Sequence, residues 1–179
     1  MDWKKDIDSS WTLFLDRDGV INVRIIDGYV RNIDEFHFLP GVLDAFRRFS
    51  EVFGRIIIVT NQQGVGKGIM SEADVEKVHS HLKSAVEGSN GRIDGIYFCP
   101  QLKTEPDNYR KPSPKMALMA KADFPDIDFS KSVMVGDSET DIEFGQNAGM
   151  HTVFIGNETT TAKPDEYYAS LFEFSNNIL

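Results

Sequence analysis

Acidic side chains in this sequence gather at two places where a short apolar run ends. Asp16 and Asp18 follow the run that ends at Leu15, and Asp137 follows a later run, with Asp141 four residues further on. Residues two apart in an extended chain point to the same side, so Asp16 and Asp18 can approach one reacting centre. Carboxylates crowded in this way repel one another unless a cation neutralises them, and oxygen ligands near phosphate favour Mg²⁺. The spacing predicts a magnesium site with Asp137 as a ligand and Asp141 as its support or as a helix cap.

Each acidic cluster also has a plain structural interpretation. Asp16–Gly19 is a common turn sequence, and Asp137–Ser138 is a common start of a helix. Both clusters nevertheless follow strand-like runs, and ligands of parallel sheets bind beyond the carboxyl ends of the strands. The joint placement favours one functional site over two independent turns.

Donor groups that suit a phosphoryl group are found at similar positions. Thr60 and Asn61 directly follow an apolar run and can donate hydrogen bonds to phosphoryl oxygens. Lys111 offers a positive charge. An isolated lysine is most often solvated, but the prolines after Lys111 stiffen its loop and can hold the ammonium in place. Lys111 is therefore predicted to stabilise a phosphoryl group during transfer.

The elements expected to position these residues are strands that alternate with helices. The strand-length apolar runs are Trp11–Leu15, Arg55–Thr60, Ile93–Phe98, Ser132–Val135 and Thr152–Ile155. The segments with helical spacing are Val42–Phe53, Ser71–Val86, Pro114–Ala122 and Asp141–Ala148. Continuously apolar strands separated by helices indicate a parallel sheet covered on both faces, so we expect a doubly wound α/β fold.

Two stretches lie outside this alternation. Val20–Leu39 is irregular, too short for a cap domain and long enough to form a flap over an open site. Beyond Gly156 we expect a last helix, Asp165–Phe174, and no chemistry. The length of 179 residues fits one domain, which we assign to residues 1–179.

Composition excludes several classes of function. The net charge of -9, with scattered lysines and arginines, argues against a nucleic-acid surface. No apolar run approaches the roughly 20 residues of a membrane helix, and Met1–Ser10 lacks an apolar signal core, so we expect a cytoplasmic protein without membrane contact. Cys99 is the single cysteine, which excludes an internal disulfide and a cysteine zinc cluster.

Four segments together resemble the ordered motifs of the haloacid dehalogenase (HAD) superfamily of phosphatases. They are Phe14–Asn22, Val59–Gly64, Arg110–Pro112 and Val135–Gly136–Asp137 with Asp141. Within the superfamily the set is similar to the group of histidinol-phosphate and heptose 1,7-bisphosphate phosphatases, and Gly28–Tyr29–Val30 adds to the likeness. The resemblance covers about Thr12 to Ile155 and implies a Rossmann-like HAD core with no large cap domain.

The resemblance implies a role for each motif. Asp16 attacks phosphorus and forms an aspartyl-phosphate, while Asp18 protonates the leaving oxygen and then activates water. Mg²⁺ is held by the Asp16 carboxylate, the backbone carbonyl of Asp18, and Asp137. The residues that bind the substrate or its phosphoryl group are Thr60, Asn61, Gln62, Gln63, Arg110 and Lys111, with Asp27 and Tyr29 on the flap.

The sequence departs from this group in one loop. Members commonly hold zinc before the third motif with three cysteines and a histidine, and here Cys99 is one of the four, so no zinc is expected. The leading substrate is a small sugar phosphate, best a heptose bisphosphate, because Arg110 beside Lys111 can pair with a second anionic group. Histidinol phosphate is the alternative. The other departures are Ser138, where a lysine often follows the metal aspartate, and a longer flap at Arg24–Asp27.

Other signals favour different interpretations. Gly64–Gly68 lacks the glycine and hydroxyl positions of a P-loop, so it is read as a flexible loop with Lys67 solvated. His79 and His81 diverge on a helix, which predicts surface or packing roles. A phospho-accepting receiver uses a similar constellation without hydrolysis, but it has no need of an acid-base residue such as Asp18. A scaffold that has lost turnover is a third alternative, and it is disfavoured because every expected catalytic residue is present.

Overall fold

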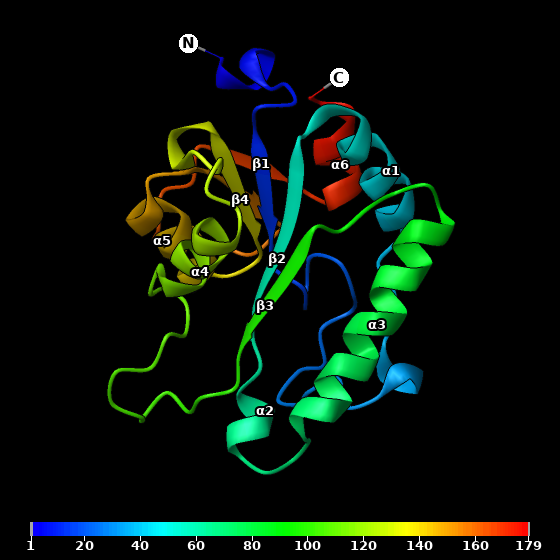
Figure 1. The fold of residues 1–179 in the computed structure, drawn as a ribbon, viewed down its shortest axis with the longest axis vertical. Coiled ribbons are helices and arrows are strands. Elements are labelled where there is room, and N and C mark those ends of the chain that lie inside the picture. The colour runs from blue at the N-terminus through cyan, green and yellow to red at the C-terminus, as the bar shows by residue number, and fades with distance from the viewer. Residues whose placement is uncertain (1, 179) are drawn as a thin grey trace.

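The computed structural model describes residues 2–178, which form one six-stranded sheet flanked by helices (Figure 1). The strands are β1 Thr12–Leu15, β2 Arg55–Asn61, β3 Gly95–Cys99, β4 Ser132–Gly136, β5 His151–Ile155 and β6 Glu166–Tyr168. Their order is β3-β2-β1-β4-β5-β6, and every neighbouring pair is parallel. The predicted doubly wound α/β fold is confirmed. The strand order reverses between β1 and β4, and sheets of this kind bind ligands at that switch point.

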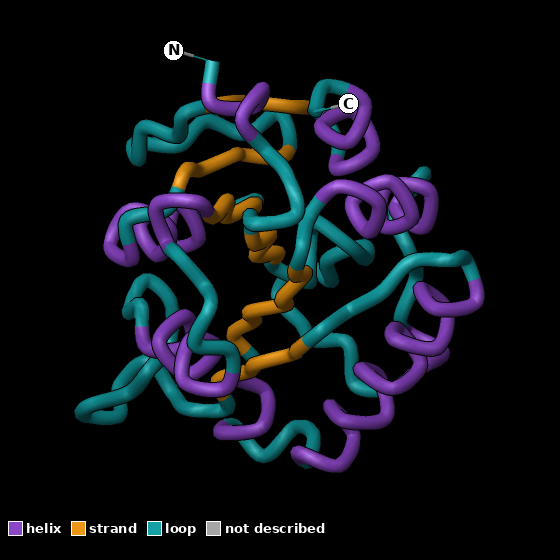
Figure 2. Tube along the Cα trace, turned by 45° about the horizontal axis from the view of Figure 1, so that its top comes forward, coloured by secondary structure: helices purple, strands orange, loops and turns teal. Residues whose placement is uncertain are grey.

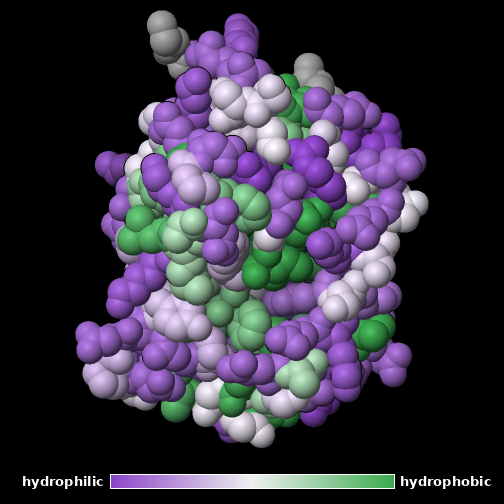
Figure 3. All heavy atoms as spheres, viewed as in Figure 1, coloured by the Kyte–Doolittle hydropathy of each residue, from purple (hydrophilic) through white to green (hydrophobic). Residues whose placement is uncertain are grey.

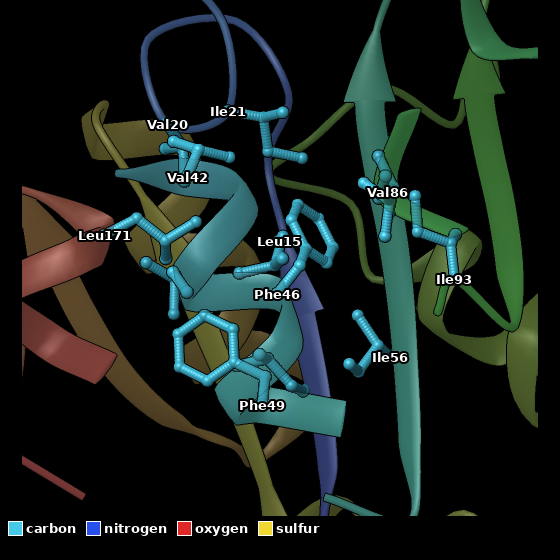
Figure 4. Packing of buried hydrophobic residues seen from close by; sticks show 14 of the residues in the cluster. Leu15, Val20, Ile21, Val42, Phe46, Phe49, Ile56, Val86, Ile93 and Leu171 are labelled. Carbon is cyan, nitrogen blue, oxygen red and sulfur yellow. The ribbon is translucent and has the colours of Figure 1, made fainter. Parts of the chain in front are cut away.

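Each face of the sheet carries its own apolar core. The strands are buried on both faces, so neighbouring side chains of β1 divide between the two cores. Leu13 and Leu15 belong to the larger core, and Phe14 belongs to the smaller one. In Figure 4, Leu15 lies against Phe46 of the neighbouring helix. The carboxyl end of β1 is thus anchored from both sides.

The α-helices of the described residues are α1 Val42–Val52, α2 Gln63–Gly66, α3 Glu72–Gly88, α4 Lys115–Asp123, α5 Glu139–Ala148 and α6 Leu171–Asn176. Four of them, α1, α3, α4 and α5, occur where the apolar periodicity indicates them, with ends displaced by one or two residues. The short 3₁₀ helices are η1 Trp3–Asp6, η2 Ile33–Glu35 and η3 Phe129–Lys131. Helices cover both faces of the sheet (Figure 2). Ser71 caps α3 through a reciprocal pair of bonds with Asp74.

The segment Val20–Leu39 crosses the carboxyl end of the sheet without joining it. Its two arms meet through backbone bonds from Val23 to His37 and from Leu39 to Ile21. Val20, Ile21, Val30 and Phe36 are buried in the larger core, so the base of this flap is fixed. Among the described residues no cap domain follows β1, which leaves the sheet edge open.

The chain after β5 differs from the expected last helix, Asp165–Phe174. That prediction was wrong, because Glu166–Tyr168 forms β6 beside β5, and α6 begins only at Leu171. Asp165 accepts hydrogen bonds from the backbone and side chain of Thr152, which fixes the start of β6 in parallel register. The loop expected at Gly64–Gly68 also contains a turn of helix, α2.

The surface is mainly polar, and apolar residues gather in the middle of the face drawn in Figure 3. No helix within residues 2–178 is long and apolar enough to cross a membrane.

Candidate active site

A cavity of about 930 Å³ opens at the carboxyl ends of the central strands. The sequence-predicted residues that line it are Asp16, Asp18, Asp27, Tyr29, Thr60, Asn61, Gln63, Arg110, Lys111 and Asp137. They come from the ends of β1, β2 and β4, from the flap and from the loop after β3. The parallel sheet therefore brings together side chains that are far apart in the sequence.

Three carboxylates at the floor of the cavity form one cluster. Ligand atoms of Asp16, Asp137 and Asp141 all lie within 4.8 Å of one another. Burial and the negative charges of Asp141 and Asp137 raise the pKa of Asp16 well above its ordinary value, although Lys111 opposes the shift. Burial and Asp141 likewise raise the pKa of Asp137 to about 6. The cluster has an excess of negative charge, which suits a divalent cation with oxygen ligands.

Lys111 is the buried counter-charge of this cluster. Its Nζ donates to Asp16 Oδ1 at 2.7 Å and to the Val59 carbonyl at 2.8 Å, and it lies 2.6 Å from Asp141 Oδ1. The side chain is 4 % exposed. Burial alone would lower the pKa of Lys111, but Asp141 and Asp16 outweigh burial and raise it. The ammonium is charged and held at one position beside Asp16.

Asp141 lines the cavity and supports the cluster, and both of its carboxylate oxygens have partners. Its Oδ1 pairs with Lys111, and its Oδ2 accepts from the backbone N–H groups of Asp137 and Ser138 and from the Ser138 hydroxyl. These bonds close the capping box at the start of α5. Asp141 thus fixes both Lys111 and the turn that carries Asp137.

Asp137 lies directly against the backbone of Gly19. This glycine has φ +88°, a left-handed conformation that L side chains rarely adopt, and a Cβ atom there would lie 1.9 Å from Asp137 Oδ2. Glycine at position 19 lets the β1 loop and the β4 loop approach closely. The Asp16 and Asp137 carboxylates meet because of this close approach.

Asp18 is held by four bonds from three neighbours. Both oxygens accept from Arg17 Nη2 at 3.1 Å, Asn22 Nδ2 donates at 2.9 Å, and Gln62 Nε2 donates at 2.9 Å. Burial alone would raise the pKa of Asp18, but the Arg17 charge and the Asn22 and Gln62 bonds outweigh it and lower the pKa. Asp18 is therefore a carboxylate in this conformation, with its position fixed by donors.

The β2 end supplies Thr60 and Asn61 to the cavity and Gln62 to its support. Thr60 lines the cavity. Asn61 accepts from the backbone N–H of Lys111 and donates to its carbonyl, so it holds the lysine loop as well as lining the cavity. Gln62 does not line the cavity: it is 1 % exposed, and its amide donates to Asp18 and Thr60.

The outer wall of the cavity is basic and comes from three segments. Gln63 Nε2 donates to Tyr29 Oη, and Lys67 Nζ lies 5.4 Å from the centre of the Tyr29 ring. Arg110 is half-buried and lines the same cavity. Asp27 lines the flap side with φ 54°. Exposed Lys67 is solvated, as expected, but it lies at the rim of the cavity.

The loop where the resemblance implies zinc in related proteins is held by hydrogen bonds. Gln101 Oε1 accepts from the backbone N–H of Tyr109, and its amide donates to Glu105. Glu105 also accepts from the backbone of Leu102. Asn108 donates to the Glu105 carbonyl, so the turn is tied across its width. These bonds fix the backbone that leads to the Arg110 motif.

Sequence reasoning missed the residues that act behind the cavity wall or on the flap. Arg17 is a fully buried, charged residue. Its position between Asp16 and Asp18 is the sequence feature that could have indicated its place in the site. Arg24 Nη1 lies 3.6 Å from Asp137 Oδ2, a contact between flap and floor that spacing could not indicate.

Comparisons with known proteins agree with this geometry. A family model described as HAD-hydrolase-like matches residues 108–172. D-glycero-alpha-D-manno-heptose-1,7-bisphosphate 7-phosphatase of Mycobacterium tuberculosis is 38% identical over 92% of this chain and 90% of its own length. The protein of the same name from Burkholderia mallei is 40% identical over 80% of this chain and 78% of its own.

A solved structure is similar over almost the whole fold. D,D-heptose 1,7-bisphosphate phosphatase from B. bronchiseptica, in complex with magnesium and phosphate, superposes with a TM-score of 0.84 and 25% identity, over 94% of this chain and 97% of that one. A parallel sheet with an aspartate cluster and a buried lysine at its carboxyl edge suits phosphoryl transfer to an aspartate. This chain belongs to the HAD-like hydrolase family.

Proposed function

We propose that this chain, as a single domain of residues 1–179, is a Mg²⁺-dependent phosphatase that removes the 7-phosphate of D-glycero-D-manno-heptose 1,7-bisphosphate. The observation that carries the proposal is the buried Asp16 carboxylate, aligned by Lys111 on the floor of a cavity that also contains Asp18 and Asp137. The names of the relatives supply the substrate and the position of the phosphate that is cleaved.

In this mechanism Asp16 is the nucleophile. One oxygen accepts from Lys111, so the other can attack phosphorus, and an aspartyl-phosphate forms as the bond to the leaving oxygen breaks. Lys111 is charged and stabilises the equatorial oxygens as charge develops, with Thr60 beside it. When bound, Mg²⁺ neutralises the phosphoryl charge, and Asp16, Asp137 and the Asp18 carbonyl would hold it.

Asp18 moves the proton in both half-reactions. Its pKa is lowered in the free site, so the group is ionised there, as its second task as the base that activates water requires. In the first half-reaction it must carry a proton for the leaving oxygen. The negative charge of the incoming phosphate opposes ionisation of a neighbouring carboxyl and therefore favours the protonated form.

The second phosphate of the substrate would meet the basic outer wall. Arg110 is half-buried, and burial lowers its pKa without removing its charge at neutral pH, so it is a strong partner for an anion. Lys67 lies beside Tyr29 on the same wall. Histidinol phosphate has one phosphate and a cationic remainder, which fits this wall poorly.

The test is the release of phosphate from heptose 1,7-bisphosphate, histidinol phosphate and para-nitrophenyl phosphate, with Mg²⁺ and with EDTA. We expect Mg²⁺-dependent multiple turnover, the heptose 1-phosphate as product, and the highest kcat/KM for the bisphosphate. Asp16→Asn should abolish turnover, and Asp18→Asn should lower it by about 10²–10⁴-fold. One phosphate per chain without turnover would instead indicate a receiver-like protein.

Arg110 provides a sharper test of the bisphosphate. Arg110→Ala should raise KM for the bisphosphate by at least about tenfold, since a charged hydrogen bond contributes about 1.5–3 kcal/mol, and should leave KM for para-nitrophenyl phosphate nearly unchanged. Arg47→Ala, on the exposed side of α1, is the matched control. Equal effects on both substrates would contradict the assignment of Arg110 to the second phosphate.

We also propose that the loop before Arg110 needs no zinc, because Gln101 and Glu105 supply the bonds that fix it. Elemental analysis of the purified protein should find less than about one zinc per ten chains. One tightly held zinc per chain would contradict this assignment.

A further inference from the structure

A charged side chain, Arg17, is fully buried beside Asp18 and does not line the cavity. Arg17 is 0 % exposed, and its Nη2 donates to both oxygens of Asp18. Its Nη1 lies 3.0 Å from His79 Nε2 on α3. Its Nε has no hydrogen-bond partner among the described residues. Within residues 2–178, the hydrogen bonds of this guanidinium go to Asp18 and His79.

The contact fixes the chemical form of the His79 ring. A guanidinium has donors and no acceptor, so His79 Nε2 must accept the bond, and the ring proton must lie on Nδ1. The ring is 7 % exposed and contacts Phe98 edge-on, with ring centres 5.8 Å apart. Burial and the adjacent Arg17 charge lower the pKa of His79 to about 3, which agrees with a neutral ring.

We propose that His79 is a positioning residue for proton transfer, acting through Arg17 on the Asp18 carboxylate. The proposal rests on the proposed function, in which Asp18 is the acid and base. Without His79 as acceptor, both Nη1 and Nε of Arg17 would lack partners, and the Nη2 bonds to Asp18 would be the remaining hydrogen bonds of the guanidinium among the described residues. The side chains of Asn22 and Gln62 each donate one bond to Asp18, but among the described residues neither side chain has a hydrogen bond to the Arg17 guanidinium.

If His79 positions Asp18 for proton transfer, its loss should affect substrates differently according to their leaving groups. A purely structural role of His79 would not give this difference. Proton donation to the leaving oxygen matters greatly for a sugar alkoxide and little for a nitrophenolate, which leaves without a proton. The value of kcat/KM reports the steps up to phosphoryl transfer, so it excludes the later hydrolysis of the aspartyl-phosphate. Loss of His79 should therefore reduce kcat/KM for the sugar phosphate selectively.

The experiment compares His79→Leu with His79→Gln, whose amide oxygen can replace Nε2 as acceptor. His79→Leu should lower kcat/KM for heptose 1,7-bisphosphate by about 10–100-fold, a part of the 10²–10⁴ that general acid catalysis contributes, and for para-nitrophenyl phosphate by less than about threefold. His79→Gln should recover most of the loss. His81→Leu, on the same helix but edge-on to Phe36, is the matched control and should leave both values unchanged.

Another variant, His79→Asn, and the tautomer of the His79 ring provide two further tests. If His79→Leu does not fold, His79→Asn is used, since its shorter amide cannot reach Arg17 and it should show the same selective loss. The tautomer of the His79 ring, read from ¹⁵N chemical shifts of the wild-type protein, does not depend on turnover: a proton on Nδ1 supports the proposal, and a proton on Nε2 overturns it.

The outcomes separate this proposal from the proposed function. Equal losses on both substrates, or no loss in His79→Leu, would overturn the role of His79 while leaving the phosphatase intact. If the wild-type protein hydrolysed neither substrate, the proposed function would fail, and the ring tautomer would still decide whether His79 accepts from Arg17.

Discussion

In the absence of Mg²⁺, the ionised Asp137 carboxylate should lower the stability of the folded protein. In the folded protein its pKa is about 6 in place of 3.8, because burial and Asp141 oppose its charge. A carboxyl whose folded-state pKa is raised costs stability above that pKa, and the cost disappears as the pH falls toward the unfolded value. One pKa unit corresponds to about 1.4 kcal/mol, so the raised pKa of Asp137 costs about 3 kcal/mol of stability at pH 7.5.

Replacing the carboxylate by an amide should remove this cost. In EDTA at pH 7.5, Asp137→Asn should be more stable than the wild type by up to about 3 kcal/mol, and its Tm should be higher by up to about 6–12 °C, since 1 kcal/mol corresponds to about 2–4 °C at this chain length. The difference should shrink as the pH falls from 6 toward 4. In Mg²⁺ at 100 times Kd the wild type should gain about 2.7 kcal/mol, and the variant should gain little.

The assay is urea unfolding at pH 7.5 and at pH 4.5, with EDTA and with Mg²⁺. The exposed Asp34→Asn is the matched control and should differ from the wild type by less than about 0.5 kcal/mol under all four conditions. If Asp137→Asn proves less stable than the wild type in EDTA at pH 7.5, the like-charge crowding described for Asp16, Asp137 and Asp141 is not the dominant interaction of this site.

Three other substitutions test neighbouring parts of the structure. Lys111→Met should lower stability in EDTA by about 3–5 kcal/mol in urea unfolding, because the buried carboxylates of Asp16 and Asp141 lose their counter-charge. Gly19→Ala should raise the Mg²⁺ concentration for half-maximal activity by at least about tenfold, since its Cβ would displace Asp137; an unchanged value would contradict the close approach. Ser71→Ala should lower Tm by about 2–4 °C through loss of the α3 cap, with kcat unchanged, and a changed kcat would show that this helix end influences the site.

The central part of the fold could be predicted because its signals are local. Strands such as Thr12–Leu15 are continuously apolar and buried on both faces, and α1 ends just before Gly54. The last third of the chain was harder. The strand Glu166–Tyr168 is half-exposed and has no periodicity of its own, so its identity depends on pairing with β5. A partner distant in sequence decides such an edge strand.

In the candidate site, too, some residues could be predicted from local sequence signals and others depend on partners distant in sequence. Asp16, Asp18 and Asp137 were predicted to lie together because strand ends of a parallel sheet share an edge, and the fold brings them there. The support of Asp18 could not be predicted, because Arg17, Gln62 and His79 come from three elements whose relative positions only packing determines. His79 was expected to have a packing or surface role, and its contact with Arg17 became visible only in three dimensions.

The pairing of β1 with β4 has a consequence for how this protein is made. Thr12 lies opposite Ser132, so the two strands that carry Asp16 and Asp137 close a loop of about 120 residues. Parallel pairings of such long range form slowly, since the entropy of closure is lost before the contacts are gained. On the ribosome, a nascent chain that has not yet emerged beyond β4 has Asp16 without its partner carboxylate. The chain should therefore become competent to bind Mg²⁺ only after β4 and Asp137 have left the ribosome.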